Sequence, residues 1–351
     1  MKKGWEAVNE ALSEALGRMP EMVLFGLGVP DPKGVFGTTV GLREKYGARR
    51  VFDMPAAENA MTGVAIGAAL CGLRPVMCHQ RSDFALLAFD PLINGAAKWH
   101  YTFDGKNAVP LTVRLISGRG WGQGPTHSQN FQAMFAHVPG LKVVMPVFPA
   151  DAKGLLLAAI EDNNPVLVLE HRWLHGVEGP VPEGYYTTPL GKAARLRSGT
   201  QATLVAMSYM TIEAVVAADH LAKRGVECDV IDLRTISPMD WGTVFESVRR
   251  TGRLLALDTG WTTGSVASEI VARVTAECWA SLHGAPRRLG LPDYPVPTSW
   301  GLTRSFYPGA PEIVETVQAM LGGKEDLGAE ELRASRVVPH DVPGDWFKGP
   351  F

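Results

Sequence analysis

The strongest constraint on the fold is a regular alternation of short apolar runs with helical patterns from residue 23 to about residue 171. The apolar runs indicate strands buried on both faces of a sheet, and they lie at residues 23–25, 75–78, 111–116, 143–145 and 166–169. Helical patterns separate them, notably at residues 84–103 and 150–161. This order predicts a mostly parallel sheet that helices cover on both faces.

A second α/β series begins near Ala202. Its expected strands lie at residues 203–206, 229–233 and 254–257, and its expected helices at residues 212–224, 241–250 and 265–282. We therefore predict an α/β chain of two doubly wound domains, at residues 1–175 and 200–325. Residues 176–199, rich in Gly, Pro and Tyr, are expected to form an ordered surface linker. Residues 326–351 are expected to form a tail whose aromatic side chains dock on a neighbour.

Composition excludes several classes of protein. With 46% hydrophobic and 20% charged residues over 351 positions, the chain has the composition of a globular protein with room for two cores. The formal net charge of -2 offers no electrostatic footprint for nucleic acid or for an anionic membrane. The four cysteines show no metal or disulfide spacing, and no apolar run has the length of a signal core or a membrane span. The expected location is the cytoplasm.

One carboxylate, Glu58, lies where a strand turns into a helix made largely of small residues. Pro55 suits the first helical position, and Glu58 then falls in the first turn, where its charge meets the positive end of the helix dipole. Capping and catalysis explain Glu58 about equally well on these local grounds. The small residues at 63–69 leave the helix little bulk, so another backbone, a subunit or a flat ligand can approach it closely.

The glycine-rich run at residues 118–125 follows a strand, but it lacks the spacing of a dinucleotide or phosphate loop. We interpret it as a flexible loop that faces a ligand. His127 ends this loop, before an expected helix at 128–134 with Ser128 as its cap, and is either a structural histidine or a working group. His137 fits a helix C-terminus. Phe84 is equally well explained by core packing or by contact with a ligand.

At several of these residues the chain resembles the beta subunit of the thiamine-diphosphate-dependent decarboxylating component of 2-oxo acid dehydrogenases, of the pyruvate, branched-chain or acetoin type within the transketolase-like superfamily. The resemblance extends from about residue 23 to residue 321. The segments that carry it are residues 34–42, 50–53 with Glu58, 94–98, 127–129, 139–146, 151–155, 161–165, 232–240 and 258–261.

The resemblance implies a pyrimidine-binding domain followed by a transketolase C-terminal-like domain. It implies that Glu58 hydrogen-bonds the aminopyrimidine ring of thiamine diphosphate, that Phe84 packs on that ring and that His127 faces the substrate. The backbone carbonyls of residues 159–164 resemble a structural potassium site. The resemblance also implies the reaction, in which a 2-oxo acid is decarboxylated and its acyl unit is transferred to a lipoyl carrier. A lipoyl acyltransferase is then a further partner.

The family's motif for the diphosphate and Mg²⁺ is absent from the sequence, so no metal-binding residue is assigned to this chain. By the resemblance, an alpha subunit supplies that half of the site, in an α2β2 assembly with the cofactor at the interface.

The chain departs from the family at Leu27 and Gly28, where relatives commonly carry acids, and at residues 169–175. Two alternatives therefore stay open. One is a split transketolase-like enzyme that moves a two-carbon unit to an aldehyde or sugar. The other is a noncatalytic regulatory subunit of the same fold.

Overall fold

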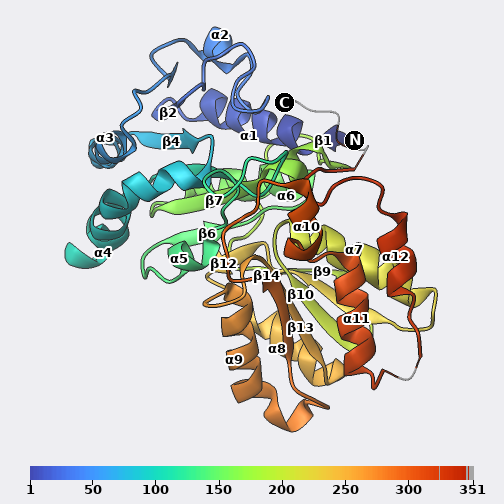
Figure 1. The fold of residues 1–351 in the computed structure, drawn as a ribbon. Helices are drawn as coiled ribbons and strands as arrows, with labels where there is room; N and C mark the ends of the chain where they lie inside the picture. Colours follow the sequence, from blue (N-terminus) through green and yellow to red (C-terminus); the bar gives the residue numbers. More distant parts are fainter. Residues whose placement is uncertain (324, 345–346, 348–351) are drawn as a thin grey trace.

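The computed structural model describes residues 1–323, 325–344 and 347. Its larger sheet has seven strands in the order β12-β6-β7-β5-β4-β2-β3. Figure 1 labels β2, β4, β7, β6 and β12 of this sheet, from the top of the molecule to its centre. Six of the seven strands come from the first half of the chain and pair in parallel. The strands are β2 (Met22–Gly26), β3 (Val51–Phe52), β4 (Arg74–His79), β5 (Thr112–Ser117), β6 (Lys142–Val144), β7 (Val166–His171) and β12 (Thr235–Ser237).

Helices bury both faces of this sheet, as the apolar runs predicted. On one face α1 (Gly4–Arg18) and α6 (Pro149–Glu161) pack against each other and share a core with side chains such as Val76. On the other face α3 (Glu58–Leu70) packs near the neighbouring side chain, Met77. Successive residues of β4 thus enter different cores, because side chains alternate between the faces of a strand. The first domain also contains three short helices, α2 (Leu42–Tyr46), α4 (Ala97–Thr102) and α5 (Gln132–Ala136).

The second sheet has five strands in the order β14-β13-β10-β11-β9. Its strands are β9 (Ala194–Arg197), β10 (Ala202–Ala206), β11 (Cys228–Asp232), β13 (Leu254–Trp261) and β14 (Arg287–Leu291). The helices around it are α7 (Tyr209–Ala222), α8 (Trp241–Thr251), α9 (Val266–Cys278), α10 (Trp300–Phe306), α11 (Ala310–Met320) and α12 (Ala329–Ser335). All of its strand pairs are parallel except that of β9 with β11. The predicted α/β class with two doubly wound units is confirmed.

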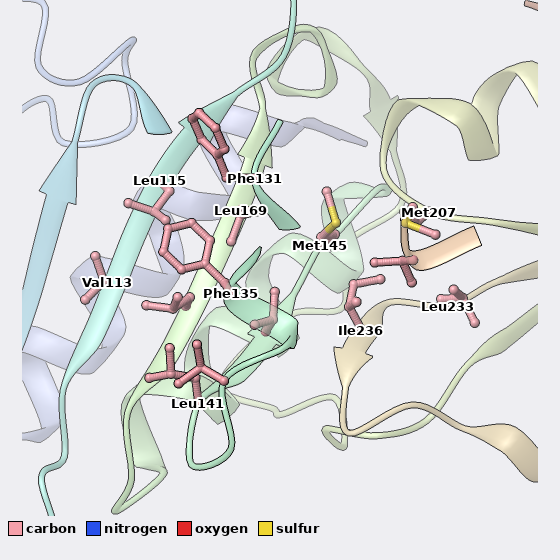
Figure 2. Close-up of a cluster of buried hydrophobic side chains, with 14 of the residues drawn as sticks. Val113, Leu115, Phe131, Phe135, Leu141, Met145, Leu169, Met207, Leu233 and Ile236 are labelled. Atoms are coloured by element: carbon pink, nitrogen blue, oxygen red, sulfur yellow. The ribbon is translucent and has the colours of Figure 1, made fainter. Parts of the chain in front are cut away.

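The two sheets share one hydrophobic cluster. Figure 2 shows Phe131, Phe135 and Met145 from the first half in the same cluster as Met207 and Ile236 from the second. The strand β12 reinforces this junction because it crosses over and pairs antiparallel with β6 of the larger sheet. The halves are therefore joined by a common core and by a shared sheet edge.

Several local expectations were wrong. The stretch expected as a helix at residues 84–103 is helical from residue 82 to residue 102, but it is not a regular α-helix. Its winding changes from the 3-10 helix η1 (Ser82–Ala88) to the π-helix η2 (Pro91–Ala96) and then to α4, and Pro91, which cannot donate a backbone hydrogen bond, lies at the first change. Pro55 does not begin α3, which starts three residues later at Glu58. Ser128 is not a helix cap, because α5 begins only at Gln132.

The expected linker at residues 176–199 carries two strands, β8 (Glu178–Gly179) and β9. The first pairs with β1 (Lys2–Lys3) and the second lies at the edge of the five-stranded sheet. Of the expected tail, residues 345–346 and 348–351 lie outside the described part of the chain. Among the helices that the structure describes, none is long and apolar enough to cross a membrane.

Candidate active site

Glu58 is the first residue of α3, and its side chain is buried, with 7% of its surface exposed. No residue in the described part of the chain donates a hydrogen bond to its carboxylate. Thr62 hydroxyl donates instead to the Glu58 backbone carbonyl, at 2.7 Å. A buried carboxylate without a donor is costly, although the N-terminal end of α3 offsets part of that cost through the helix dipole. Glu58 therefore has an acceptor available for a group from outside this chain.

The structure brings Phe84 and His127 together from different loops. Phe84 lies on η1, which follows β4, and His127 lies on the loop that follows β5. Their ring centroids are 5.6 Å apart, with the ring planes perpendicular. Because β4 and β5 are parallel neighbours, both loops leave the carboxyl edge of the sheet, where open α/β sheets bind ligands.

Three hydrogen bonds hold these two loops against each other. Ser82 hydroxyl donates to the Gln129 carbonyl at 3.2 Å, and the Gln129 amide donates to the Asp83 carboxylate at 2.7 Å. The Arg81 guanidinium donates to the Gln123 side-chain carbonyl. Burial raises the pKa of Asp83 despite the hydrogen bond from Gln129. Gln129 is thus committed to this junction through both its backbone carbonyl and its side chain.

Glu58 is linked to the same group of residues through its neighbour. The Asn59 side-chain amide donates to the Leu87 carbonyl of η1 at 3.3 Å. α3 also packs along η1 and η2. The three residues singled out in the sequence therefore lie on contacting elements at one edge of the larger sheet.

The glycine-rich loop at residues 118–125, which we expected to be flexible, is held in place by contacts on two sides. Gly118 has a φ of +91°, and a Cβ there would lie 2.2 Å from the ring of His171, so only glycine fits without movement. Further along, the Trp121 N–H donates to the Asp341 carbonyl at 2.8 Å. The Gly122 N–H donates to the Asp341 carboxylate at 2.5 Å. The C-terminal segment therefore fixes the loop that leads to His127.

Gly28 has a local reason for lacking an acidic side chain. Its φ is +73°, and a Cβ there would meet the Gln80 side-chain amide at 2.5 Å. That amide donates to the Leu27 carbonyl, and the Gly28 N–H reaches the Asp53 carboxylate at 3.2 Å. A side chain at position 28 would displace this arrangement.

Sequence reasoning missed a buried ion cluster behind the site. Arg114, in the middle of β5, forms a two-point ion pair with Glu170 of β7, at 2.6 and 2.8 Å. His175 lies 2.9 Å from the same carboxylate, and Arg114 also donates to the Thr38 hydroxyl. Burial raises the pKa of Glu170, but the charge of Arg114 outweighs it and holds that pKa at about 2. The only sequence signal was an arginine inside an apolar run.

The carbonyls implied as potassium ligands have a partner of their own. The Arg74 guanidinium donates to the carbonyls of Ile160, Glu161 and Asp162 at 2.9, 3.2 and 3.2 Å. The Ala159 carbonyl accepts from the Thr112 hydroxyl. These oxygens do not fit a potassium site as they stand, because a cationic side chain already satisfies them. Within the described residues, no cluster of His, Cys, Asp or Glu could hold a metal ion.

Comparisons with known proteins agree with this architecture. The family model described as transketolase, pyrimidine binding domain, matches residues 2–176, and that of the transketolase C-terminal domain matches residues 191–313. A split-gene transketolase solved as an inactive beta4 tetramer aligns with a TM-score of 0.73, covering 92% of this chain and 99% of that one. At 23% sequence identity this likeness concerns the fold alone.

Two curated relatives are much more similar in sequence. The beta subunit of acetoin:2,6-dichlorophenolindophenol oxidoreductase from Cupriavidus necator is 40% identical over 91% of this chain and 97% of its own length. The beta subunit of the pyruvate dehydrogenase E1 component from Rhizobium meliloti is 40% identical over 90% of this chain and 69% of its own length. The resemblance drawn from the sequence segments is thus confirmed. The chain belongs to the transketolase-like family of beta subunits that includes those of the pyruvate dehydrogenase E1 component and of acetoin oxidoreductase.

Proposed function

We propose that this chain is the beta subunit of a heteromeric thiamine-diphosphate-dependent 2-oxo acid dehydrogenase, and that Glu58, Phe84 and His127 are its working residues. The observation that carries the proposal is the ring contact of His127 with Phe84 on η1, which adjoins α3, the helix that begins at the buried Glu58. A second candidate is the cleavage of acetoin, because acetoin oxidoreductase beta subunits from two bacteria are 40% and 39% identical to this chain.

The residues at the site fit an aminopyrimidine ring. Such a ring needs an acceptor or shared proton at one nitrogen and an apolar face, and the donorless Glu58 carboxylate and the Phe84 ring supply these features. When bound, thiamine diphosphate supplies the carbon nucleophile that attacks the substrate carbonyl and stores the resulting negative charge. Glu58 holds a proton in a hydrogen bond to the ring nitrogen. His127 donates a hydrogen bond to the substrate oxygen, and its position beside Phe84 keeps the imidazole oriented.

The partner is an alpha subunit that holds the diphosphate and Mg²⁺, in an α2β2 assembly. The outer face of α3 supports this proposal. At Gly63 and Gly67 an added Cβ would meet no atom within 4 Å, and Val64 between them is 58% exposed. Leu87 of the adjoining η1 is 64% exposed. An exposed apolar strip of small residues permits close backbone approach by another subunit next to Glu58.

Potassium is not part of the proposal, because Arg74 occupies the carbonyls that would bind it. We place the enzyme in the cytoplasm. The four cysteines are free thiols, which suits a reducing compartment.

The proposal is tested by a substrate panel with the reconstituted complex. The chain is co-purified with its alpha partner and supplied with pyruvate, branched-chain 2-oxo acids, acetoin or a ketose. Each substrate is assayed with an artificial electron acceptor and with a lipoyl domain. We expect turnover of a 2-oxo acid, with acylation of the lipoyl domain. Turnover of acetoin alone would support the second candidate.

Two-carbon transfer from a ketose to an aldehyde would instead indicate a split transketolase. If none of these substrates is consumed by a complex that binds thiamine diphosphate, the chain is a noncatalytic subunit.

A further inference from the structure

Arg119 is a buried cation that has no carboxylate or hydrogen-bond partner among the described residues. It lies in the glycine-rich loop after β5 and is 7% exposed. Its Nε atom is buried without a hydrogen bond, and no carboxylate within the described residues lies at ion-pair distance from the guanidinium. Three aromatic rings surround it instead, those of Trp173, Tyr209 and Tyr307, at 4.6, 5.2 and 4.2 Å from the guanidinium carbon. Cation–π contacts recover only part of the cost of removing such a charge from water.

Arg119 forms part of the wall of a cavity of about 320 Å³. The cavity lies between α7 and α11 on one side and α12 with the following tail on the other, and its lining includes Arg336 and His340. This volume is at the lower end of the range of small-molecule sites.

The charges around the cavity favour an anion. Arg336 donates only to backbone carbonyls, those of Pro339 and Val342, so its charge also lacks a carboxylate partner among the described residues. Two carboxylates also line the cavity, but each has partners of its own. Glu213 accepts hydrogen bonds from the Ala310 N–H at 2.8 Å and from the Tyr209 hydroxyl, and Glu312 pairs with Arg333. Burial, together with the surrounding arginines, lowers the pKa of His340 to about 4, so its ring is neutral at pH 7.

We propose that this cavity binds the phosphate or carboxylate group of a small anionic metabolite, with Arg119 and Arg336 as its cationic ligands. The hydroxyl of Tyr307 and the neutral ring of His340 add hydrogen bonds to the same group. A guanidinium that lacks a hydrogen-bond partner among the described residues gains one in the complex, which supplies the driving force for binding.

Binding there joins the C-terminal tail to the loop that ends at His127. The tail contributes Arg336 and His340, and Asp341 already holds the loop through Trp121 and Gly122. The matched family model ends at residue 313, before the tail begins. Arg336 and His340 therefore lie beyond the family's matched domains, whereas Arg119, Tyr209 and Tyr307 lie within them, and Glu58 is not part of the lining.

The test measures the melting temperature of the full-length chain in inorganic phosphate, in acetate and in sodium chloride at equal ionic strength. Wild type is compared with Arg119→Met, which keeps the stem in its aromatic cage but removes the charge. Arg273→Met is the matched control, because Arg273 also lies over an aromatic ring, that of Trp241, but outside the cavity. We expect a saturating anion to raise the Tm of wild type and of the control by about 3 °C relative to chloride. Arg119→Met should show no anion-dependent rise.

A rise with phosphate alone assigns a phosphorylated ligand, and a rise with acetate assigns a carboxylate. If neither anion raises the Tm of wild type above that in chloride, the proposal is overturned. It is also overturned if Arg119→Met responds like wild type. Should Arg119→Met fail to fold, titration calorimetry with phosphate on Arg336→Gln replaces it. Binding at least about 5-fold weaker than wild type supports the site, and unchanged affinity refutes it.

Discussion

Asp232, at the end of β11, makes the stability of the second domain depend on pH. It is completely buried, and its only described donors are the Arg234 N–H at 3.2 Å and the Thr211 hydroxyl at 3.5 Å. Its second carboxylate oxygen is buried and has no hydrogen-bond partner within the part of the chain that the structure describes. Burial raises the pKa of Asp232 from an ordinary value of 3.8 to about 7, and the nearby Asp151 carboxylate acts in the same direction. We predict that Asp232→Asn removes this pH dependence.

The magnitude follows from the gap of about 3 pH units between the unfolded and folded pKa values of Asp232. At 1.36 kcal/mol per unit, that gap corresponds to about 4 kcal/mol. The folded state binds the proton more tightly, so this contribution is fully present below pH 3.8. The contribution is lost as the pH rises through the folded pKa of about 7, and at higher pH nothing further is lost. Between pH 5 and pH 7, wild type should therefore lose about 2 kcal/mol relative to Asp232→Asn, because Asp232 is still half protonated in the folded state at pH 7.

The assay is urea unfolding of both proteins at pH 5, 6, 7 and 8. Only the difference between the two free energies of unfolding is compared, because the other titrating groups are common to both proteins. The free energy of unfolding of Asp232→Asn should rise relative to that of wild type up to about pH 7, and the difference should then level off. A difference that does not change between pH 5 and pH 8 would refute the assignment of a raised pKa to Asp232.

Three further outcomes are expected. Glu170→Gln leaves the Arg114 guanidinium buried without its counter-charge and should lower the free energy of unfolding by about 3–5 kcal/mol, measured in urea. Replacing potassium chloride by sodium chloride in the buffer should shift the Tm by less than about 1 °C, because Arg74 already donates to the backbone carbonyls of residues 160–162. A larger fall in Tm would show that potassium binds there. Gly67→Tyr should weaken binding to the alpha partner at least about 10-fold in titration calorimetry, whereas Gly284→Tyr, which also enters open space, should not; equal affinities would remove α3 from the interface.

The sequence pattern predicted the central strands well because their periodicity reflects burial on both faces. Strands β2, β4, β5, β7, β10, β11 and β13 all overlap the expected runs. β12 was not expected as part of the larger sheet, because three residues paired with a strand some ninety positions away leave no local pattern. β9 was not predicted either, because its four residues alternate with arginine and lie in a segment that we expected to be a linker.

The sequence singled out candidate site residues, but it did not indicate the contacts that hold them in place. Local rules left Glu58 equally a helix cap and a working group, and the structure shows why, since Glu58 both starts α3 and lies buried. The contact of Phe84 with His127 depends on the parallel pairing of β4 with β5, which no short segment encodes. The aromatic surroundings of Arg119 could not be predicted, because the three rings that contact its guanidinium come from three separate segments of the chain.

The central claim is that Glu58 acts on the cofactor at an interface with an alpha subunit. The most direct measurement compares wild type with Glu58→Gln in the reconstituted complex, following consumption of the best 2-oxo acid and assembly by size exclusion. The amide preserves the shape of the side chain but cannot share a proton with the ring nitrogen. We predict normal assembly and a fall in kcat of at least about 100-fold. Equal kcat values for the two assembled complexes would contradict the account.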